Sequence, residues 1–546
     1  MENTSEKRFE GTEMMDVQMK ADEQETAVAK KNLDLGKSNE YSPNETLSSI
    51  ENIDKLTTIQ TFYVNQCLFI TGGTGFMGKM LIEKLLRGCP GINCIYVLIR
   101  RKKDKSVSKR MEDIVENSLF NTLRKQQPGF QNRIVAIEGD CSLPNLGIST
   151  TDRAKLIREV SIVFNVAATV RFNENIKLAA AINVQSLKDL IHLSKEMSKL
   201  KSFVHVSTVY ANCLQNQIEE KFYDPPMNAD KFIALMESMD EKLLDDITPH
   251  LLGIWPNTYV YTKSIAENIV KRHAGLMPIG IFRPGIVLPT YIEPAQGWID
   301  NINGLVGITA GVTMGIIRTN LCDGSLIVNI IPGDLTTNAL IISAWDIANN
   351  RRSIEEIPIY NYTSMDNPIT YEEFIKMSRK NIELLPTNEA IWYISFWNIK
   401  YRPIYLTFMY FLHILPAIII DTISLCIGKK PRLLKMYKKI YTLVNIFNYF
   451  ATTKFNFNNK RWNELLSKLT AEDREFFFCD IRDLIWDTYF KNYILGIRMY
   501  ILKDPIETLP QARMKWQRLY WIHQALKLFI VCVFLMITWV MIFRHF

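Results

Sequence analysis

The sequence has no Cys-x-x-Cys pair and no His-Glu-x-x-His motif, although it contains nine cysteines and seven histidines. The cysteines are odd in number and irregularly spaced, which is typical of reduced thiols in a cytosol-facing protein and not of a disulfide framework. No two histidines stand at a recognised ligand spacing. We therefore expect neither structural disulfides nor a metal site.

The chain also lacks a large excess of charge of one sign, because 64 Lys and Arg residues are balanced by 57 Asp and Glu residues over 546 positions. The net charge of +7 is scattered along the sequence, so it argues against a nucleic-acid partner. A hydrophobic content of 47% at this length allows a large core and predicts about two or three domains.

Residues 1–56 contain no apolar run and no signal-peptide pattern, and they are rich in Glu, Lys, Asn, Ser and Thr. This composition predicts a disordered tail, with the folded chain beginning near Thr57. Further on, short β-branched runs alternate with helical stretches, and the expected strands are residues 67–70, 95–99, 134–137, 162–164, 203–206 and 279–282. The alternation predicts an α/β fold with a doubly wound parallel sheet over residues 57–349, followed by a helical C-terminal domain over residues 350–524.

The first expected strand runs directly into a glycine-rich turn, in which Gly72, Gly75 and Gly78 stand three residues apart before a helix. In a βαβ unit such glycines allow a tight turn, a close approach of backbone N–H groups to a pyrophosphate, and close packing of helix on strand. Thr74 and Phe76 belong to the same turn. An ordinary glycine turn is the alternative, but the position between the first strand and the first helix favours a dinucleotide site.

The second expected strand ends in a positively charged cluster, Arg100, Arg101 and Lys102. An NAD-specific site normally has a carboxylate here, which binds the 2′-hydroxyl of the ribose. Because a guanidinium binds a phosphate in a bidentate fork, the cluster predicts NADP rather than NAD. A solvated basic turn is the alternative.

Five further residues follow later strands, at positions where the cofactor is expected to lie. Asp140 is placed to accept a hydrogen bond from the adenine amino group, and Asn165 and Ala167 are expected to border the cofactor groove. Pro284 and Ile286 flank a turn whose backbone can bind the nicotinamide carboxamide. Each of these residues is also compatible with an ordinary loop beyond a strand, although their order along the chain favours the cofactor site.

Tyr259 and Lys263 stand four residues apart at the start of an expected helix, so their side chains share one face. Reduction of a carbonyl makes an alkoxide, which needs a proton donor with a pKa near the working pH. Lys263 is expected to lower the pKa of Tyr259 by electrostatic attraction and to hold the nicotinamide ribose. Tyr261 has no such partner, because Ile265 stands four residues on. A surface helix with an amphipathic pair is the alternative.

Ser207 and Thr208 end the fifth expected strand and supply hydroxyl groups that can polarise a substrate carbonyl, and we prefer Thr208. Asn183, on the helix after the fourth strand, has two equal interpretations. It either holds a water molecule for proton relay or is a buried, hydrogen-bonded structural residue.

Together these residues resemble an extended short-chain dehydrogenase/reductase, and the detail is similar to the fatty acyl-CoA reductases, a male-sterility-type family. The matching stretches are residues 69–78, 82–87, 96–100, 167–172, 205–208, 255–259, 293–294 and 297–301, and then 360–364, 413–421 and 496–498. The resemblance implies reduction of a long-chain fatty acyl-CoA by NADPH to a fatty alcohol, through the aldehyde, with release of CoA. Departures at residues 331–334 and 454–457 put chain-length choice or stability in doubt more than activity.

Two other functions remain open from the residues alone. An extended reductase of another substrate, such as a sterol or a sugar nucleotide, would use the same Tyr259, Lys263 and Thr208, but the large helical C-terminal region counts against it. A dinucleotide-binding protein without catalysis would be expected to lack the tyrosine or the lysine, and both are present.

Residues 525–543 form an apolar run of about nineteen residues, interrupted only by Lys527, which is long enough to span a bilayer. Basic residues on its N-terminal side predict an integral membrane enzyme whose catalytic part faces the cytosol, at the endoplasmic reticulum or the peroxisome. A buried core helix is the alternative. Membrane lipid is thus an expected partner, and the sequence leaves a homo-oligomer open.

A second apolar stretch, residues 404–427, is interrupted by His413, Pro416 and Asp421 and has basic residues at both ends. Equal flanks favour a re-entrant or interfacial hairpin, bent at Pro416, over a span. This stretch is therefore expected to touch the membrane without crossing it.

Overall fold

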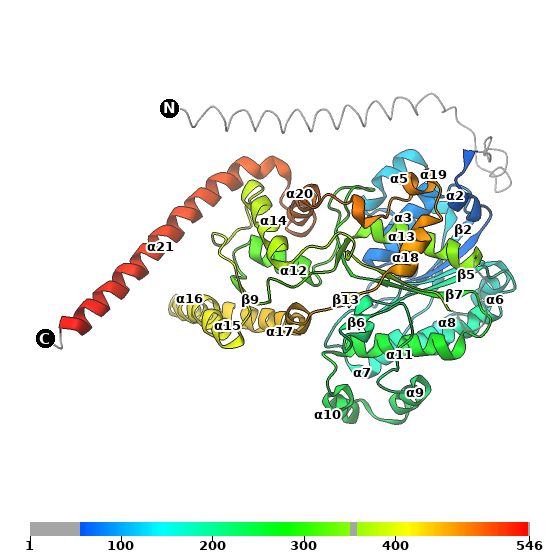
Figure 1. Ribbon diagram of the computed structural model, residues 1–546, viewed down its shortest axis with the longest axis horizontal. Coiled ribbons are helices and arrows are strands. Elements are labelled where there is room, and N and C mark those ends of the chain that lie inside the picture. Colours follow the sequence, from blue (N-terminus) through cyan, green and yellow to red (C-terminus); the bar gives the residue numbers. More distant parts are fainter. Residues whose placement is uncertain (1–54, 350–356, 544–546) are drawn as a thin grey trace. The chain divides into compact units, whose positions relative to one another are not determined.

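The computed structural model describes residues 55–349 and 357–543 of the chain (Figure 1). The tail expected over residues 1–56 lies outside the described residues, except for its last two. Helix α2 (Thr58–Phe62) begins with a capping box, in which Thr57 Oγ1 accepts from the Gln60 backbone N–H at 3.3 Å and Gln60 Oε1 accepts from the Thr57 N–H at 3.0 Å. This cap stands where the sequence places the start of the folded chain.

A seven-stranded parallel sheet has the strand order β11-β7-β5-β4-β1-β2-β3. Its strands are β1 (Cys67–Thr71), β2 (Cys94–Ile99), β3 (Ile134–Glu138), β4 (Ile162–Asn165), β5 (Ser202–Val206), β7 (Ile279–Pro284) and β11 (Ile359–Tyr362). The six strands predicted from the sequence form within two residues of their expected bounds, and the doubly wound α/β class is confirmed. Apolar residues fill both faces of the central strands, since every residue of β1 and β5 is buried.

Helices cover both faces of this sheet (Figure 1). On one face, α3 (Phe76–Gly88) and α13 (Gly333–Asn349) share an apolar core with Leu68 and Ile70 of β1. On the other face, α8 (Ser186–Lys195) and α11 (Thr258–His273) pack with Phe69 of the same strand. Alternate residues of one strand therefore enter two separate cores, as the two-residue period of a strand requires.

The edge strand β11 comes from beyond residue 349, where the sequence places the end of the sheet domain. It pairs with β7, with Ile359 opposite Ile281 and Tyr362 opposite Pro284. The sheet thus extends into the region expected to be helical. Its sequence signal is weak because Asn361 lies inside the strand, where its buried amide donates to the backbone carbonyl of Asn458 at 2.8 Å.

Three short parallel pairs of strands in the described part of the chain lie outside the main sheet, and two of them join a segment of the first part of the chain to the C-terminal region. In the described residues these pairs are β6 (Gln217–Ile218) with β13 (Asn456–Phe457), β8 (Ile286–Leu288) with β10 (Ile330–Pro332), and β9 (Thr319–Leu321) with β12 (Trp397–Ile399). The remaining α-helices before β11 are α4 (Val107–Val115), α5 (Asn121–Gln126), α6 (Thr150–Glu159), α7 (Ile176–Ala180), α9 (Ala229–Ser238), α10 (Glu241–Leu252) and α12 (Leu305–Thr313). Those after it are α14 (Tyr371–Leu384), α15 (Arg402–Met409), α16 (Leu415–Cys426), α17 (Leu433–Thr452), α18 (Lys460–Ser467), α19 (Ala471–Phe476), α20 (Trp486–Gly496) and α21 (Leu509–Phe543).

Residues 402–426 form one continuous helix, and the predicted bend at Pro416 is wrong. Helix α15 continues through a π-helical turn, η8 (Tyr410–Ile414), into α16. A proline lacks the N–H that would bond the carbonyl four residues earlier, here that of Leu412. The guanidinium of Arg318 donates to this carbonyl at 3.2 Å instead, and the π turn accommodates the ring, so the helix continues.

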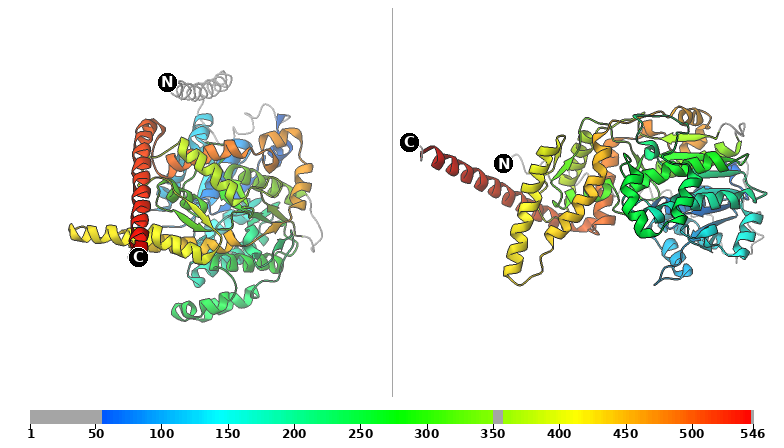
Figure 2. Two further views of the ribbon diagram at one scale, coloured as in Figure 1. Left: turned by 60° about the vertical axis from the view of Figure 1, so that its left-hand side comes forward. Right: turned by 90° about the horizontal axis from the view of Figure 1, so that it is seen from below.

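The hairpin closes later, in the turn between α16 and α17, and these helices lie side by side (Figure 2). Asp421 accepts hydrogen bonds from three backbone N–H groups at the start of α17, those of residues 432–434, at 2.9–3.0 Å. The ring of His413 stacks on Tyr437 of α17, with centroids 5.0 Å apart. The polar residues that interrupt the apolar stretch therefore make its inner contacts.

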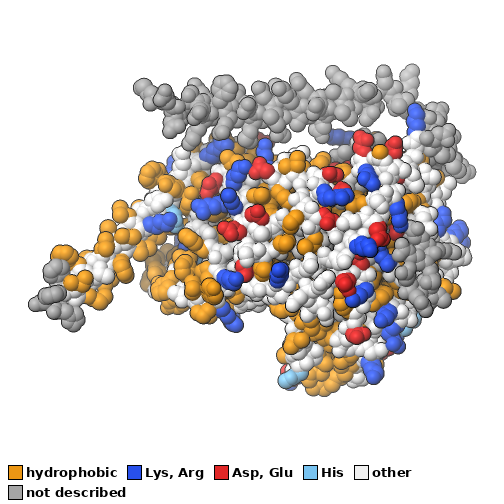
Figure 3. Space-filling view, viewed as in Figure 1, with side chains coloured by type: hydrophobic (Ala, Val, Ile, Leu, Met, Phe, Trp, Pro, Cys, Tyr) orange, Lys and Arg blue, Asp and Glu red, His pale blue; other side chains and the backbone are white. Residues whose placement is uncertain are grey.

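Two helices of the described residues are long and apolar enough to cross a membrane, Arg402–Cys426 and Ile506–Ile542. No residue in the most apolar part of the second helix is buried, and few residues in that of the first are buried. Figure 3 shows apolar side chains along the whole exposed length of α21. Such exposure differs from that of a core helix, which was the alternative for residues 525–543.

Candidate active site

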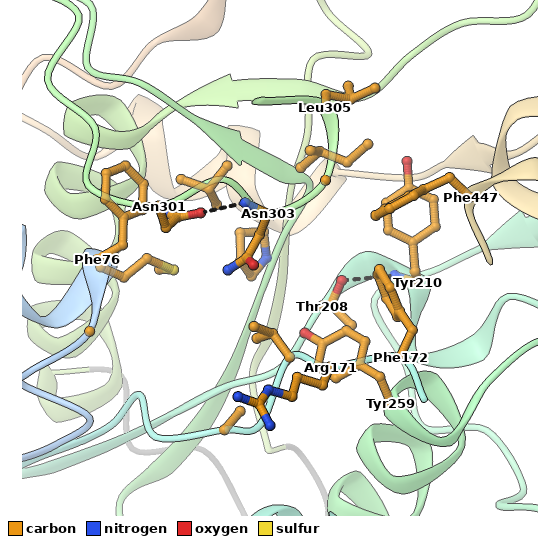
Figure 4. Close-up of a pocket in the computed structure, with 18 of the residues that line it drawn as sticks. Phe76, Arg171, Phe172, Thr208, Tyr210, Tyr259, Asn301, Asn303, Leu305 and Phe447 are labelled. Atoms are coloured by element: carbon orange, nitrogen blue, oxygen red, sulfur yellow. Dashed lines mark hydrogen bonds between the residues drawn. The ribbon is translucent and has the colours of Figure 1, made fainter. Parts of the chain in front are cut away.

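A cavity of about 1090 Å³ opens at the carboxyl ends of the sheet strands. Its walls come from the turn after β1, the ends of β2, β4, β5 and β7, the start of α11, and helices α12, α14 and α17. Pockets for one small ligand usually measure roughly 300–1,000 Å³, so this cavity lies just above that range. Figure 4 shows the part of it where Tyr259 and Thr208 point into the same space.

The glycine-rich turn between β1 and α3 leaves no room for side chains. Gly72 has a φ of 76°, and a Cβ there would lie 2.6 Å from the backbone nitrogen of Ala167. A Cβ on Gly78 would lie 2.2 Å from the Gly72 carbonyl oxygen. Gly75 caps α3 without a side-chain hydrogen bond, so the first N–H groups of the helix keep no partner within it. The turn residues that line the cavity are Gly72, Thr74, Gly75, Phe76 and Gly78. This cradle fits a pyrophosphate.

Two arginines, Arg100 and Arg110, line the cavity with Asp140. Arg100 Nε lies 3.6 Å from the Asp140 carboxylate, and Arg110 donates to the Arg100 backbone carbonyl. Arg101 does not line the cavity, because its side chain is 71% exposed and pairs with Glu138 at 2.9 Å. The sequence analysis did not identify Arg110, because this residue lies on the helix after β2 and not in the basic cluster at the strand end. The presence of a basic residue on that helix could have indicated it.

The other predicted cofactor residues fall into two groups. Ala167, Pro284 and Ile286 line the cavity. Asn165 does not line it: its side-chain oxygen accepts a hydrogen bond from Thr71 Oγ1 at 2.6 Å, which ties β4 to β1. The groove beyond β4 is bordered instead by the small residues 166–168.

Asn183 lies in a π-helical turn, η6 (Ala181–Gln185), and is 3% exposed. Its Oδ1 accepts from the Thr169 backbone N–H at 3.0 Å, and its Nδ2 donates to Thr262 Oγ1 at 3.0 Å. These contacts occupy the side chain, and they favour the structural interpretation over a proton relay.

Tyr259 and Lys263 lie in the first turns of α11, and both line the cavity. The ring of Tyr259 packs edge-on against Phe172, with centroids 5.6 Å apart. Tyr261 does not line the cavity: it is 1% exposed and packs against Phe232 at 5.8 Å. In the sequence the two tyrosines differ only in the residue four positions on. In the structure Tyr259 lines the cavity and Tyr261 does not.

The pKa values at this site differ from the sequence expectation. Burial raises the pKa of Tyr259 to about 12. Burial also lowers the pKa of Lys263 to about 8, against the opposing charge of Glu267, and Lys263 Nζ donates to the Val206 carbonyl at 2.7 Å. The predicted lowering of the Tyr259 pKa is therefore wrong, because the loss of water around the phenol raises this pKa.

The two candidate hydroxyls have different surroundings, although both line the cavity. Ser207 Oγ donates to Glu267 Oε1 at 2.6 Å. Thr208 Oγ1 accepts from the Tyr210 backbone N–H at 3.3 Å, and among the described residues it makes no hydrogen bond as a donor. Thr208 keeps its proton available for a ligand, which supports the preference for it over Ser207.

A buried ion pair behind the site was not anticipated from the sequence. Arg283 is 0% exposed and grips Glu267 in a fork, with N···O distances of 2.7 and 2.8 Å. Asn212 donates to the same carboxylate at 3.2 Å. The pair ties α11 to β7 one helical turn beyond Lys263. Its sequence signal is the four-residue spacing that runs from Tyr259 through Lys263 to Glu267.

Beyond the catalytic candidates the cavity wall becomes apolar. This apolar arm is lined by Leu305, Ile308, Val312, Phe374, Ile375, Ile382, Ile394, Phe396, Phe447 and Phe450. Phe447 of α17 packs edge-on against Phe172, with centroids 5.0 Å apart, and Phe172 in turn contacts Tyr259. The arm therefore begins at the tyrosine (Figure 4).

Two family models, both described as male sterility protein, match residues 70–340 and 412–504. The chain is 40% identical to the fatty acyl-CoA reductase wat of Drosophila melanogaster over 475 residues, which cover 87% of this chain and 91% of that protein. The chain belongs to the fatty acyl-CoA reductase family. It is also 37% identical to fatty acyl-CoA reductase 1 of Xenopus laevis and 35% identical to that of Homo sapiens, in each case over 84% of this chain and 89% of the relative.

Two solved structures that resemble this fatty acyl-CoA reductase are reductase (R) domains. The terminal R domain of the myxalamid pathway matches with a TM-score of 0.53 at 16% identity, over 81% of this chain and 92% of that one. The R domain of a nonribosomal peptide synthetase from Mycobacterium tuberculosis matches with a TM-score of 0.54 at 16% identity, over 85% and 100%. These likenesses show the fold alone. Family membership makes the reductase an oxidoreductase with a domain that binds a nicotinamide cofactor.

Proposed function

We propose that this reductase converts long-chain fatty acyl-CoA into fatty alcohol, with NADPH as hydride donor and with release of CoA. The observation that carries the proposal is a single cavity that joins the glycine-rich turn, the pair Tyr259 and Lys263, and the apolar arm. An apolar wall that begins at a proton donor suits an acyl chain whose carbonyl carbon lies beside Tyr259. The relatives named fatty acyl-CoA reductase support the same reaction class.

The proposed roles follow from the groups that reach the cavity. A bound nicotinamide cofactor supplies the hydride that is added to the acyl carbonyl carbon. Tyr259 and Thr208 donate hydrogen bonds to the carbonyl oxygen and stabilise its negative charge. The CoA thiolate then leaves, because a thiol of pKa about 8.5 is a far better leaving group than an alkoxide. In the second reduction the Tyr259 proton passes to the aldehyde oxygen, and the ammonium of Lys263 stabilises the phenolate that remains.

Arg100 and Arg110 support NADPH over NADH. Both side chains line the cavity where β2 ends, which is the position of the adenosine ribose in this fold. Two guanidinium groups next to one carboxylate, Asp140, leave a surplus of positive charge for a 2′-phosphate. The exposed Arg101 has no part in this proposal.

We also propose that α21 anchors the enzyme in the membrane of the endoplasmic reticulum or the peroxisome. The basic residues Arg513, Lys515 and Arg518 precede the apolar part of the helix. By the positive-inside rule they favour a cytosolic position for the catalytic part. A bilayer would cover the apolar side chains of this helix, none of which is buried by the rest of the protein in its most apolar part.

The substrate and the cofactor are tested together with membranes that contain the full-length chain. Acyl-CoAs of graded chain length are incubated with NADPH or with NADH, and the products are identified. We expect fatty alcohol and free CoA, with two NADPH consumed for each alcohol. Equal rates with NADH would contradict the cofactor assignment, and absence of alcohol at every chain length would contradict the reaction.

The role of Tyr259 is tested by Tyr259→Phe, which removes only the hydroxyl and keeps the ring packed on Phe172. We expect kcat to fall by roughly 10²–10⁴ while NADPH binding is nearly unchanged. Lys263→Ala should impair both, and the double variant should be little worse than the worse single variant. Tyr261→Phe is the matched control and should keep most of its activity. Loss of activity only in Tyr261→Phe would show that the wrong tyrosine is assigned.

A further inference from the structure

Two asparagines stand side by side in the wall of the cavity. Asn320 of β9 and Asn398 of β12 are paired positions in parallel neighbouring strands, and both line the cavity. Paired positions face the same side of a sheet. The next pair, Leu321 and Ile399, faces the other way and packs on Tyr405 of α15.

The side-chain oxygens of this asparagine pair have no partner. Among the described residues, neither Asn320 Oδ1 nor Asn398 Oδ1 accepts a hydrogen bond, and both atoms are buried. Asn320 is only 9% exposed. Rotation of the two amides into a mutual hydrogen bond would satisfy one of the two oxygens and leave the other unpaired.

A third unpaired group lies in the same cavity wall. Ser378 of α14, which is 5% exposed, has a buried hydroxyl without a partner among the described residues. Its neighbours on α14, Ile375 and Ile382, belong to the apolar arm. Buried polar groups are nearly always hydrogen-bonded, because a group that loses its bonds to water on burial and forms no new ones destabilises the protein. When an acyl chain displaces water from this wall, these polar groups need a ligand atom that can bond them.

We propose that the acyl arm selects fatty acyl chains that carry a hydroxyl group, and that Asn320 and Asn398 bind this hydroxyl. The proposal rests on the proposed acyl-CoA reduction and adds the substrate class. A hydroxyl both donates and accepts, so it can bond an asparagine amide in either orientation. A keto or epoxide oxygen only accepts, so it can bond an asparagine amide in one orientation alone.

An unsubstituted chain gains nothing from this wall. Its methylene groups would cover the two amides and leave their oxygens without hydrogen bonds. A pocket that is built to bond a hydroxyl discriminates against the analogue that lacks it, because its own buried groups are then unpaired. Discrimination should therefore appear both in binding and in kcat/KM.

The test compares hexadecanoyl-CoA with a series of hexadecanoyl-CoAs that carry one hydroxyl at different positions along the chain. With the full-length protein in membranes, we expect one hydroxyl position to raise kcat/KM by about tenfold, the value of one good hydrogen bond. Binding is measured as well, by the rise in Tm that each acyl-CoA produces in the detergent-solubilised protein, so that the preference is read without turnover.

Two substitutions by leucine, whose side chain is similar in volume to that of asparagine, test whether these two residues cause the preference. Asn320→Leu and Asn398→Leu should lose the preference for the hydroxylated chain, while reduction of hexadecanoyl-CoA is retained. Thr319→Val is the matched control, because Thr319 also has a buried, unpaired hydroxyl on β9 but does not line this cavity. It should keep the tenfold preference.

The outcomes separate this inference from the proposed function. Equal kcat/KM and equal Tm shifts for plain and hydroxylated chains would overturn the inference while leaving acyl-CoA reduction intact. A preference that persists in both leucine variants would overturn the assignment to the asparagine pair. If no acyl-CoA is reduced, the proposed function fails, and the Tm shifts still decide whether the arm binds a hydroxylated chain more tightly.

Discussion

The ammonium group of Lys263 is expected to titrate within the range of an ordinary activity assay. Burial lowers its pKa from the usual value near 10.5 to about 8, since the side chain is 2% exposed. In the proposed mechanism its positive charge stabilises the phenolate of Tyr259 and holds the cofactor. Activity should therefore be nearly full about one unit below pH 8, where most of the Lys263 is protonated, and should decline as the pH rises through 8.

The magnitude follows from the fraction of protonated lysine. If only the protonated form is active, kcat/KM falls by about tenfold for each pH unit above the pKa, so that about one part in a hundred remains two units above it. The pH profile of kcat/KM for NADPH reports the pKa of the free enzyme, and it is therefore the profile to measure. Titration of Tyr259 does not contribute to this alkaline decline, because the pKa of Tyr259 is about 12.

Lys263→Arg provides the control, because a guanidinium stays protonated throughout the assay range. The variant should have a lower plateau, since an arginine does not fit the lysine contact with the Val206 carbonyl. Its alkaline limb near pH 8 should disappear. A wild-type profile that stays flat to pH 10, or an unchanged limb in Lys263→Arg, would refute the assignment of this pKa to Lys263.

Three further predictions concern the cofactor, the core and the anchor. Arg110→Ala should raise the KM for NADPH about tenfold and leave the KM for NADH unchanged in steady-state assays, whereas the exposed Arg101→Ala should change neither. Asp334→Ala should lower the free energy of unfolding by about 2–3 kcal/mol in urea titrations, because the buried carboxylate accepts from three backbone N–H groups of residues 291–293 at 2.7–3.1 Å. Removal of residues 521–546 should make the protein extractable by alkaline carbonate; a truncated chain that resists extraction would show that Arg402–Cys426 spans the bilayer.

The parts of this fold that could be predicted from the sequence are those whose causes are local. The buried strands and the glycine-rich turn depend on neighbouring residues: Gly72 has a positive φ, and a Cβ on Gly78 would collide with the Gly72 carbonyl oxygen within the same turn. The edge strand β11 could not be recognised in the same way. The amide of its Asn361 is satisfied inside the strand by distant residues, since it donates to the backbone carbonyls of Asn458 and Ile218.

The sequence did not show which basic residues line the cavity, because that depends on the direction in which each side chain points. Arg100 and Arg101 are neighbours in the chain, and successive side chains at a strand end point to opposite sides. One of them therefore lines the cavity while the other pairs with Glu138 at the surface. Arg110 of α4 lines the cavity in place of Arg101. No local sequence pattern gives the orientation of that helix. Likewise, composition alone could not show that burial raises the pKa of Tyr259.

The helix of residues 402–426 shows how a local rule can be correct and its conclusion wrong. Proline at 416 does leave a carbonyl without its usual partner, but Arg318, from a distant part of the chain, donates to that carbonyl. Tyr405, His413, Ala417 and Asp421 are separated by multiples of four residues and are all buried, whereas large apolar residues on the remaining faces are exposed. The polar residues therefore mark the face that packs on α17 and are not breaks in an apolar run. Because this packing uses only one stripe of the helix, its exposed apolar side is left for a membrane to cover, beside the anchor that α21 provides in the proposed arrangement.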